Sequence, residues 1–137
     1  MQMNTKFQYM YDAAPASALI SKGAAKTASF VGNTITLDTL KGYWTSGELA
    51  DKTLAIVVNV DAADFGTADE SYDLEAKVGT VTVGVASVTG PGQYVILLDM
   101  MTVAKMAPGQ TALTLAGTVA GTTPSITLYS WISGIQK

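Results

Sequence analysis

The sequence predicts an all-β fold, a jelly-roll-like antiparallel β-sandwich of about eight strands with an extended N-terminal arm. From residue 34 onward, apolar and polar residues alternate with a period of two, as in strands that bury one face. Turns that contain glycine or proline separate these segments at intervals of roughly 10 to 25 residues. Apolar residues make up 48% of the 137-residue chain and charged residues 14%, which is typical of a folded domain with one core.

Residues 1–28 are expected to form the arm, and residues 29–137 the sandwich body. The N-terminal segment is rich in alanine, serine and lysine, and a proline and a glycine interrupt any helix there. Phe7, Tyr9 and Tyr11 alternate along it, which favours a segment that docks on the body or on a neighbouring molecule. A frayed terminus is the alternative interpretation.

The predicted strands follow one another along the body. They cover residues 34–38, 53–60, 71–78, 80–87, 93–98, 101–106, 111–119 and 125–133. The first is short and places Ile35 and Leu37 on one side. The third alternates most clearly, because Tyr72 and Leu74 share one side while acidic residues such as Asp73 point the other way. This strand should therefore have one solvent-facing side.

Two of the predicted strands lack this alternation. Residues 54–58 and 94–98 are apolar at every position, so both of their faces are expected to be covered. The sequence thus predicts that these two segments are central strands of the sheets.

Composition argues against an enzyme. The chain contains no histidine, cysteine or arginine, and therefore lacks the side chains that most often transfer protons near neutral pH. We expect no catalytic residues, no cofactor and no structural zinc site, which would need cysteine or histidine. A net charge of −3 provides no surface for nucleic acid. Apolar runs such as residues 54–58 are far shorter than the roughly 20 residues with which a helix crosses a bilayer.

Acidic residues gather between positions 61 and 75. They are Asp61, Asp64, Asp69, Glu70, Asp73 and Glu75. Calcium prefers several oxygen ligands from one loop, so a calcium-dependent domain is one interpretation. The spacing does not match an EF-hand loop, and the last two carboxylates fit the solvent face of a strand. A solvated acidic loop without a metal ion is the interpretation that we favour.

Aromatic residues mark the candidate binding positions. In the last predicted strand, Leu128 and Ile132 lie on one face, and Tyr129 and Trp131 lie on the other. Either this strand is central to a two-layer core, or the aromatic pair forms a patch for a partner, because tyrosine and tryptophan contribute strongly to interfaces. The candidate partner-binding residues are Phe7, Tyr9, Tyr11, Tyr43, Trp44, Tyr129 and Trp131.

The order of these segments resembles a known family, the small cement or decoration proteins of tailed-bacteriophage capsids. The resemblance is carried by residues 34–38, a glycine-bearing loop, the strand at 54–60, the acidic loop, the strand at 71–74, residues 103–108 and the turn at 120–124. It implies a jelly-roll-like structural virion protein on the outer surface of a capsid, where it binds the major capsid protein and reinforces the lattice. It supplies no catalytic residues. Because soluble homo-oligomers usually have closed symmetry, we further expect self-association as a dimer or trimer.

A second function class stays open. A receptor- or carbohydrate-binding β-sandwich module, from a phage tail or a surface protein, would use Trp44 and Trp131 to stack on sugars. Binding to glycans rather than to capsids would distinguish it from the first.

Overall fold

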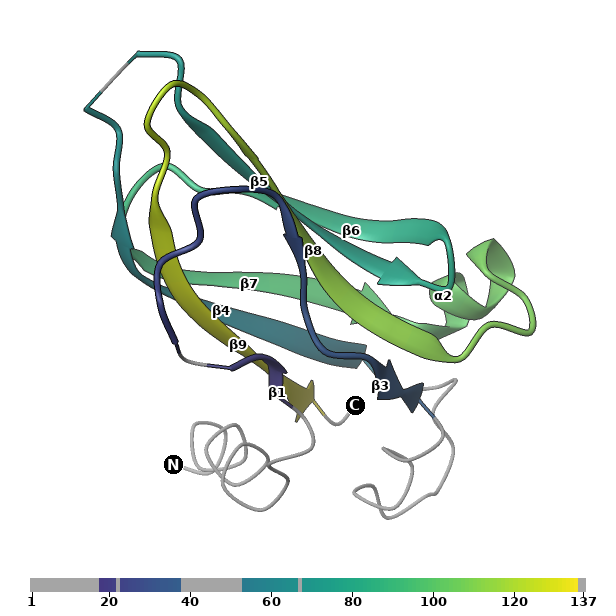
Figure 1. Cartoon of the computed structure of the whole chain (residues 1–137). Coiled ribbons are helices and arrows are strands. Elements are labelled where there is room, and N and C mark those ends of the chain that lie inside the picture. Colours follow the sequence, from purple (N-terminus) through teal and green to yellow (C-terminus); the bar gives the residue numbers. More distant parts are fainter. Residues whose placement is uncertain (1–17, 22, 38–52, 67, 136–137) are drawn as a thin grey trace, which may run out of the picture.

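The computed structural model of the chain describes residues 18–21, 23–37, 53–66 and 68–135, and these form two antiparallel β-sheets packed face to face (Figure 1). Sheet A has the strand order β1 (Ala18–Ile20), β9 (Ile126–Ile135), β4 (Thr53–Ala63) and β7 (Gly92–Asp99). Sheet B has the order β2 (Phe30–Val31), β8 (Ala112–Ala120), β5 (Ser71–Val78) and β6 (Val81–Ser87), and β3 (Ile35–Thr36) also pairs with β8. The predicted all-β sandwich is confirmed.

The core lies between the sheets and follows the alternation of the sequence. On β5, Tyr72 and Leu74 are buried while Asp73 is exposed, as predicted. On β4, Leu54 and Ile56 join the same core cluster. Two residues of β1 also belong to it, namely Leu19 and Ile20, so this part of the expected arm contributes to the core.

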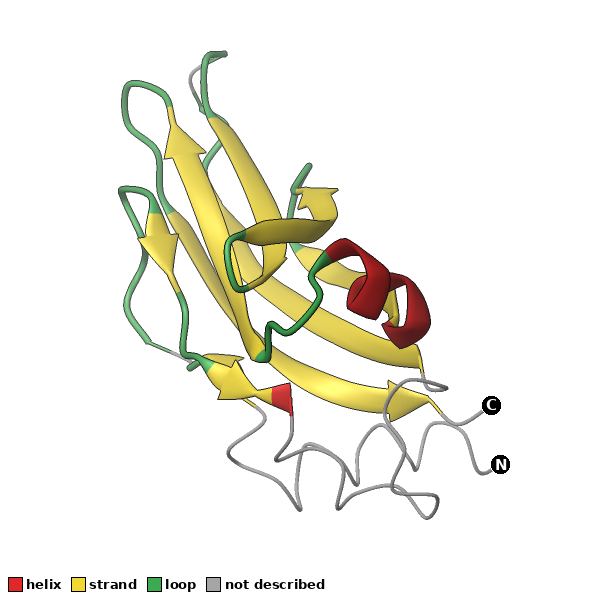
Figure 2. Ribbon diagram, turned by 90° about the vertical axis from the view of Figure 1, so that its right-hand side faces the viewer, coloured by secondary structure: helices red, strands yellow, loops and turns green. Residues whose placement is uncertain are grey.

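The segment predicted as a strand at residues 101–106 is a helix instead. The helix α2 (Met100–Met106) follows β7 directly and lies at one end of the sandwich (Figure 2). Met100 and Val103 are its buried residues, and their spacing of three places both on one helical face. The strand prediction was wrong because a short apolar run does not distinguish a strand from one buried helical turn.

The two strands predicted to be central differ in their positions. β4 lies between β9 and β7, so the prediction for residues 54–58 is confirmed. β7, in contrast, is the last strand of sheet A, and Val95 and Leu97 on its outer face are exposed. The prediction that residues 94–98 are covered on both faces was wrong, because only one face of the strand is covered: Ile96 and Leu98 belong to the core and Tyr94 packs against it.

Close packing of β6 on β7 determines the separation of the sheets at this margin. Gly84 of β6 has no side chain, and a Cβ atom there would lie 2.6 Å from Cγ2 of Ile96 and 3.2 Å from Cδ2 of Leu98. The inner side of β7 is therefore held tightly against sheet B. Within the part of the chain that the structure describes, no helix is both long and apolar enough to span a membrane.

Candidate functional site

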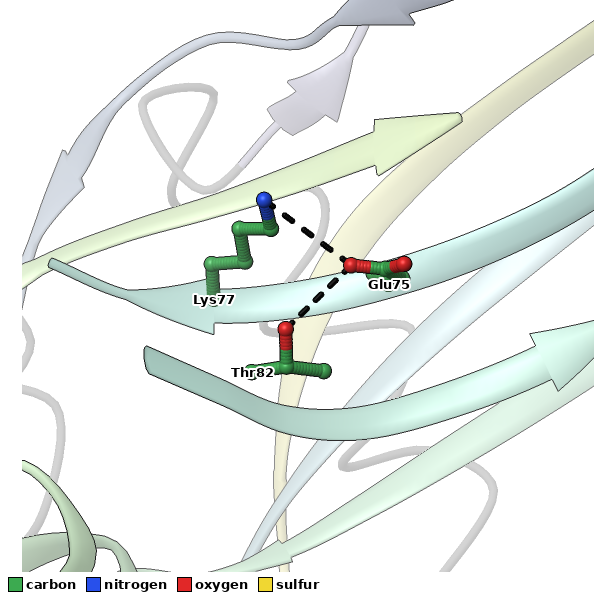
Figure 3. Close-up of polar contacts among 3 residues, drawn as sticks. All are labelled: Glu75, Lys77 and Thr82. Carbon is green, nitrogen blue, oxygen red and sulfur yellow. Dashed lines mark hydrogen bonds and ion pairs between the residues drawn. The ribbon is translucent and has the colours of Figure 1, made fainter. Parts of the chain in front are cut away.

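The outer face of sheet B is polar. Asp73, Glu75 and Lys77 alternate along β5 on this face, and they form short-range contacts with the neighbouring strand. Thr82 donates a hydrogen bond of 3.2 Å from its hydroxyl to Oε1 of Glu75, and Nζ of Lys77 lies 3.8 Å from the same oxygen, as Figure 3 shows. Ser87 donates a 2.8 Å hydrogen bond to Asp73. The outer face of β5 is therefore polar, although two single valines of the same sheet are exposed, Val31 of β2 and Val85 of β6.

The outer face of sheet A has the opposite character. Its outward residues come from the three longest strands of the sheet, which lie side by side (Figure 1). We call this surface the apolar face, and it comprises Ala55, Val57, Val95, Leu97, Tyr129 and Trp131. The register places Val57 of β4 directly between Val95 of β7 and Trp131 of β9. Directly opposed side chains of neighbouring strands lie within contact range, so the face is continuous.

Exposure is uneven across the apolar face. Ala55 and Val57, on the central strand, are only 0% and 5% exposed although they lie outside the core cluster. Val95 and Leu97, on the edge strand, are 52% and 59% exposed. The accessible part of the apolar face is therefore its margin along β7.

The two aromatic candidates of the last strand lie together on the apolar face. The rings of Tyr129 and Trp131 stack at a centroid distance of 5.5 Å with 22° between their planes. Both side chains are half-buried, while Leu128 and Ile132 of the same strand point into the core. The predicted division of this strand into two faces is confirmed. The other candidates, Phe7, Tyr9, Tyr11, Tyr43 and Trp44, lie outside the described residues.

Val95 and Leu97 were not among the binding residues predicted from the sequence. The sequence contained a signal for them, because residues 94–98 are apolar at every position, so this strand places apolar side chains on the outer face of its sheet as well as in the core. Only the strand order shows that β7 is an edge strand and that its outer side chains stay exposed.

The acidic segment and the turn before β9 are joined by hydrogen bonds into one corner of the sandwich, and they do not form a cation site. Tyr72 is buried, and its hydroxyl donates to the Asp64 carbonyl oxygen and accepts a 2.9 Å hydrogen bond from the Ser125 amide. Asp69 accepts a 2.8 Å hydrogen bond from the Thr122 hydroxyl, which lowers the pKa of this carboxyl below its ordinary value. These bonds tie the loop before β5 to the turn before β9.

No group of three acidic residues within the described ranges is placed to hold one metal ion. The carboxylates of this segment instead bind hydroxyl groups: Thr123 donates a 2.9 Å hydrogen bond to Glu70, in the same way that Thr122 donates to Asp69. Hydrogen bonds within the corner therefore account for the positions of these two carboxylates.

The apolar face can bind a partner through apolar contacts. Residues 55–59, 93–97 and 127–131 contain no acidic or basic residue, and tyrosine is their only ionisable residue type. What they offer is apolar area, whose removal from water stabilises a complex by about 25 cal/mol per Å². No protein-family model matches the chain, and no curated protein matches it significantly.

Proposed function

We propose that this protein is a structural virion protein that binds the outer surface of a phage capsid and reinforces its lattice. The observation that supports the proposal is the contrast between the two outer faces of the sandwich. The outer face of β5 in sheet B presents carboxylates and a lysine to water, whereas the outer face of β7 in sheet A presents two exposed apolar side chains, Val95 and Leu97. A protein with one solvated polar face and one apolar binding face is suited to lie on a larger surface.

Adhesion of this kind needs no active site, cofactor or switch. Each copy on a repetitive lattice makes the same contact, and a modest contact is sufficient when copies are linked. Linking two binding sites raises overall avidity by about 10²- to 10⁴-fold without any new contact. The apolar face therefore fits lattice binding better than it fits the tight capture of a single small ligand.

Two variants with the same chemical change test this proposal. Val95→Gln places an amide on the apolar face, and Val85→Gln places one on the outer face of sheet B, where Val85 is 69% exposed. Burying a valine side chain fully contributes about 1.5–3 kcal/mol, and Val95 has about half of its surface left to bury. Val95→Gln should therefore weaken capsid attachment by about 1 kcal/mol per contact, or about fivefold.

The measurement is co-sedimentation of purified protein with undecorated capsids over a range of protein concentrations. Val85→Gln should bind as the unsubstituted protein does. Equal loss of binding in both variants, or in neither, would contradict the assignment of the apolar face as the docking surface. Absence of any capsid binding by the unsubstituted protein would refute the proposed function.

A carbohydrate-binding module is the second candidate, and the stacked pair of Tyr129 and Trp131 favours it. Aromatic rings give sugars a flat apolar surface, although these two are half-buried and partly cover one another. Binding on a glycan array that is lost in Trp131→Ala, together with no binding to capsids, would replace the first function by this one.

A further inference from the structure

The edges of the two sheets are not alike. An unpaired edge strand presents backbone N–H and C=O groups to other chains, and natural proteins usually protect such edges by short strands, bulges, proline or lysine. Among the described strands, β1 has three residues and a register shift, and β2 and β3 have two residues each. β6 has a register shift where it pairs with β5. Each of these edge strands is therefore either very short or carries a register shift.

β7 lacks every one of these protections. It pairs with β4 over eight consecutive residues, from Gly92 to Asp99, without a shift in register. The strand contains no lysine and no proline, and its single charge is Asp99 at the end. Val95 and Leu97 on its outer face are more than half exposed. A long, regular, apolar edge of this kind is a template for another strand.

We propose that β7 pairs antiparallel with β7 of a second copy of this chain, around a two-fold axis at Ile96. In this register Val95 lies opposite Leu97 of the second copy, and the same pair repeats on the other side of the axis. Gln93 lies opposite Asp99 of the second copy, where an amide donor meets a carboxylate. The two Asp99 side chains lie at opposite ends of the paired region, so their like charges stay apart.

The neighbouring registers are chemically poorer. An axis at Val95 would place Leu97 opposite Gln93 of the second copy, leaving an apolar side chain beside an amide. An axis at Leu97 would place Val95 opposite Asp99 of the second copy, so that a carboxylate loses water against a valine. Only the axis at Ile96 pairs both exposed apolar residues with apolar residues.

Pairing at the edge does not cover the outward side of Val95 and Leu97. Edge hydrogen bonds lie in the plane of the sheet, whereas side chains point perpendicular to it. Two copies joined in this way would form one continuous sheet, with two apolar faces side by side on the same surface. Dimerisation would therefore link two docking surfaces, although its test requires no capsid and does not rest on the proposed function.

A pair of double variants tests both the edge and the register. Val95→Lys with Leu97→Lys places like charges opposite one another across the axis, so the dimer should dissociate. Val95→Lys with Leu97→Glu places a lysine opposite a glutamate of the second copy, so the dimer should persist. Both double variants change the same two exposed positions of the monomer and remove the same apolar contacts.

The readout is molar mass by analytical ultracentrifugation at several protein concentrations, in buffer of low ionic strength. The unsubstituted protein and the Lys/Glu variant should reach twice the chain mass of 14.2 kDa, and the Lys/Lys variant should remain at 14.2 kDa. Circular dichroism confirms that each variant is folded. The Lys/Glu variant should also lose capsid attachment while remaining dimeric, which separates this proposal from the proposed function.

Disulfide cross-linking gives an independent test, because the chain has no cysteine of its own. When chains with Val95→Cys are mixed with chains with Leu97→Cys and oxidised, the mixed dimer should exceed both homodimers, since these two positions lie directly opposite one another. A predominance of Val95→Cys homodimers would indicate the axis at Val95, and would overturn the proposed register. A monomeric unsubstituted protein, or a Lys/Lys variant that stays dimeric, would overturn the proposal as a whole.

Discussion

Replacement of Gly84 by alanine tests how tightly β6 packs on β7, the strand that carries the exposed margin of the apolar face. The new methyl group would lie 2.6 Å from Cγ2 of Ile96 and 3.2 Å from Cδ2 of Leu98. Ordinary contacts between carbon atoms are about 3.5–4.0 Å, so the strands would have to separate by about 1 Å. Ile96 and Leu98 are buried core residues and have little room to move.

Two opposing effects determine the size of the loss. Overpacking a core typically costs about 1–3 kcal/mol. Gly→Ala also removes conformational freedom from the unfolded chain, which stabilises the protein by about 0.4–1 kcal/mol where the backbone accepts it. Gly84 has no positive φ, so this gain applies. The net expectation is that Gly84→Ala lowers the free energy of unfolding by about 1–2 kcal/mol, or the melting temperature by roughly 3–8 °C for a chain of this length.

Gly90→Ala is the matched control. A Cβ atom at this position meets no heavy atom within 4 Å, and its φ is not positive, so the substitution should be neutral or slightly stabilising. Urea unfolding at equilibrium, analysed by linear extrapolation with the slopes compared, measures both variants. A Gly84→Ala variant as stable as Gly90→Ala would show that β6 and β7 are not in close contact.

Two further predictions concern the corner before β5 and β9. Tyr72→Phe removes a hydroxyl that bridges the Asp64 carbonyl and the Ser125 amide, and we expect a loss of about 1–3 kcal/mol in the free energy of unfolding, measured in urea; an unchanged midpoint would contradict it. Thr122→Val should raise the pKa of Asp69 toward its ordinary value of 3.8 in a carbon-13 NMR titration, because the hydroxyl bond is lost. A carboxyl whose pKa is lowered in the folded state stabilises the fold above the unfolded-state pKa, and this stabilisation is lost as the pH falls. The variant should therefore lose less stability below about pH 4 than the unsubstituted protein. A pKa of Asp69 that does not move would refute this assignment.

Part of the candidate site could be predicted from the sequence. Alternation at residues 126–132 is enough to place Tyr129 and Trp131 on the face opposite Leu128, because successive side chains of a strand point in opposite directions. The same rule predicts that the outer face of β5 is polar. What the rule does not contain is the identity of the neighbouring strand, and therefore whether an outer face is covered.

The sequence by itself determined the fold class, the inward and outward sides of the alternating strands, and the lack of histidine and cysteine chemistry. Tertiary structure alone decided that residues 54–58 are central while residues 94–98 lie at an edge, since both runs are apolar throughout. It also decided that Met100 and Val103 bury one side of a helix at the end of the sandwich. The physical reason is that side-chain direction is a local property of the backbone, whereas strand order depends on contacts between residues far apart in the chain.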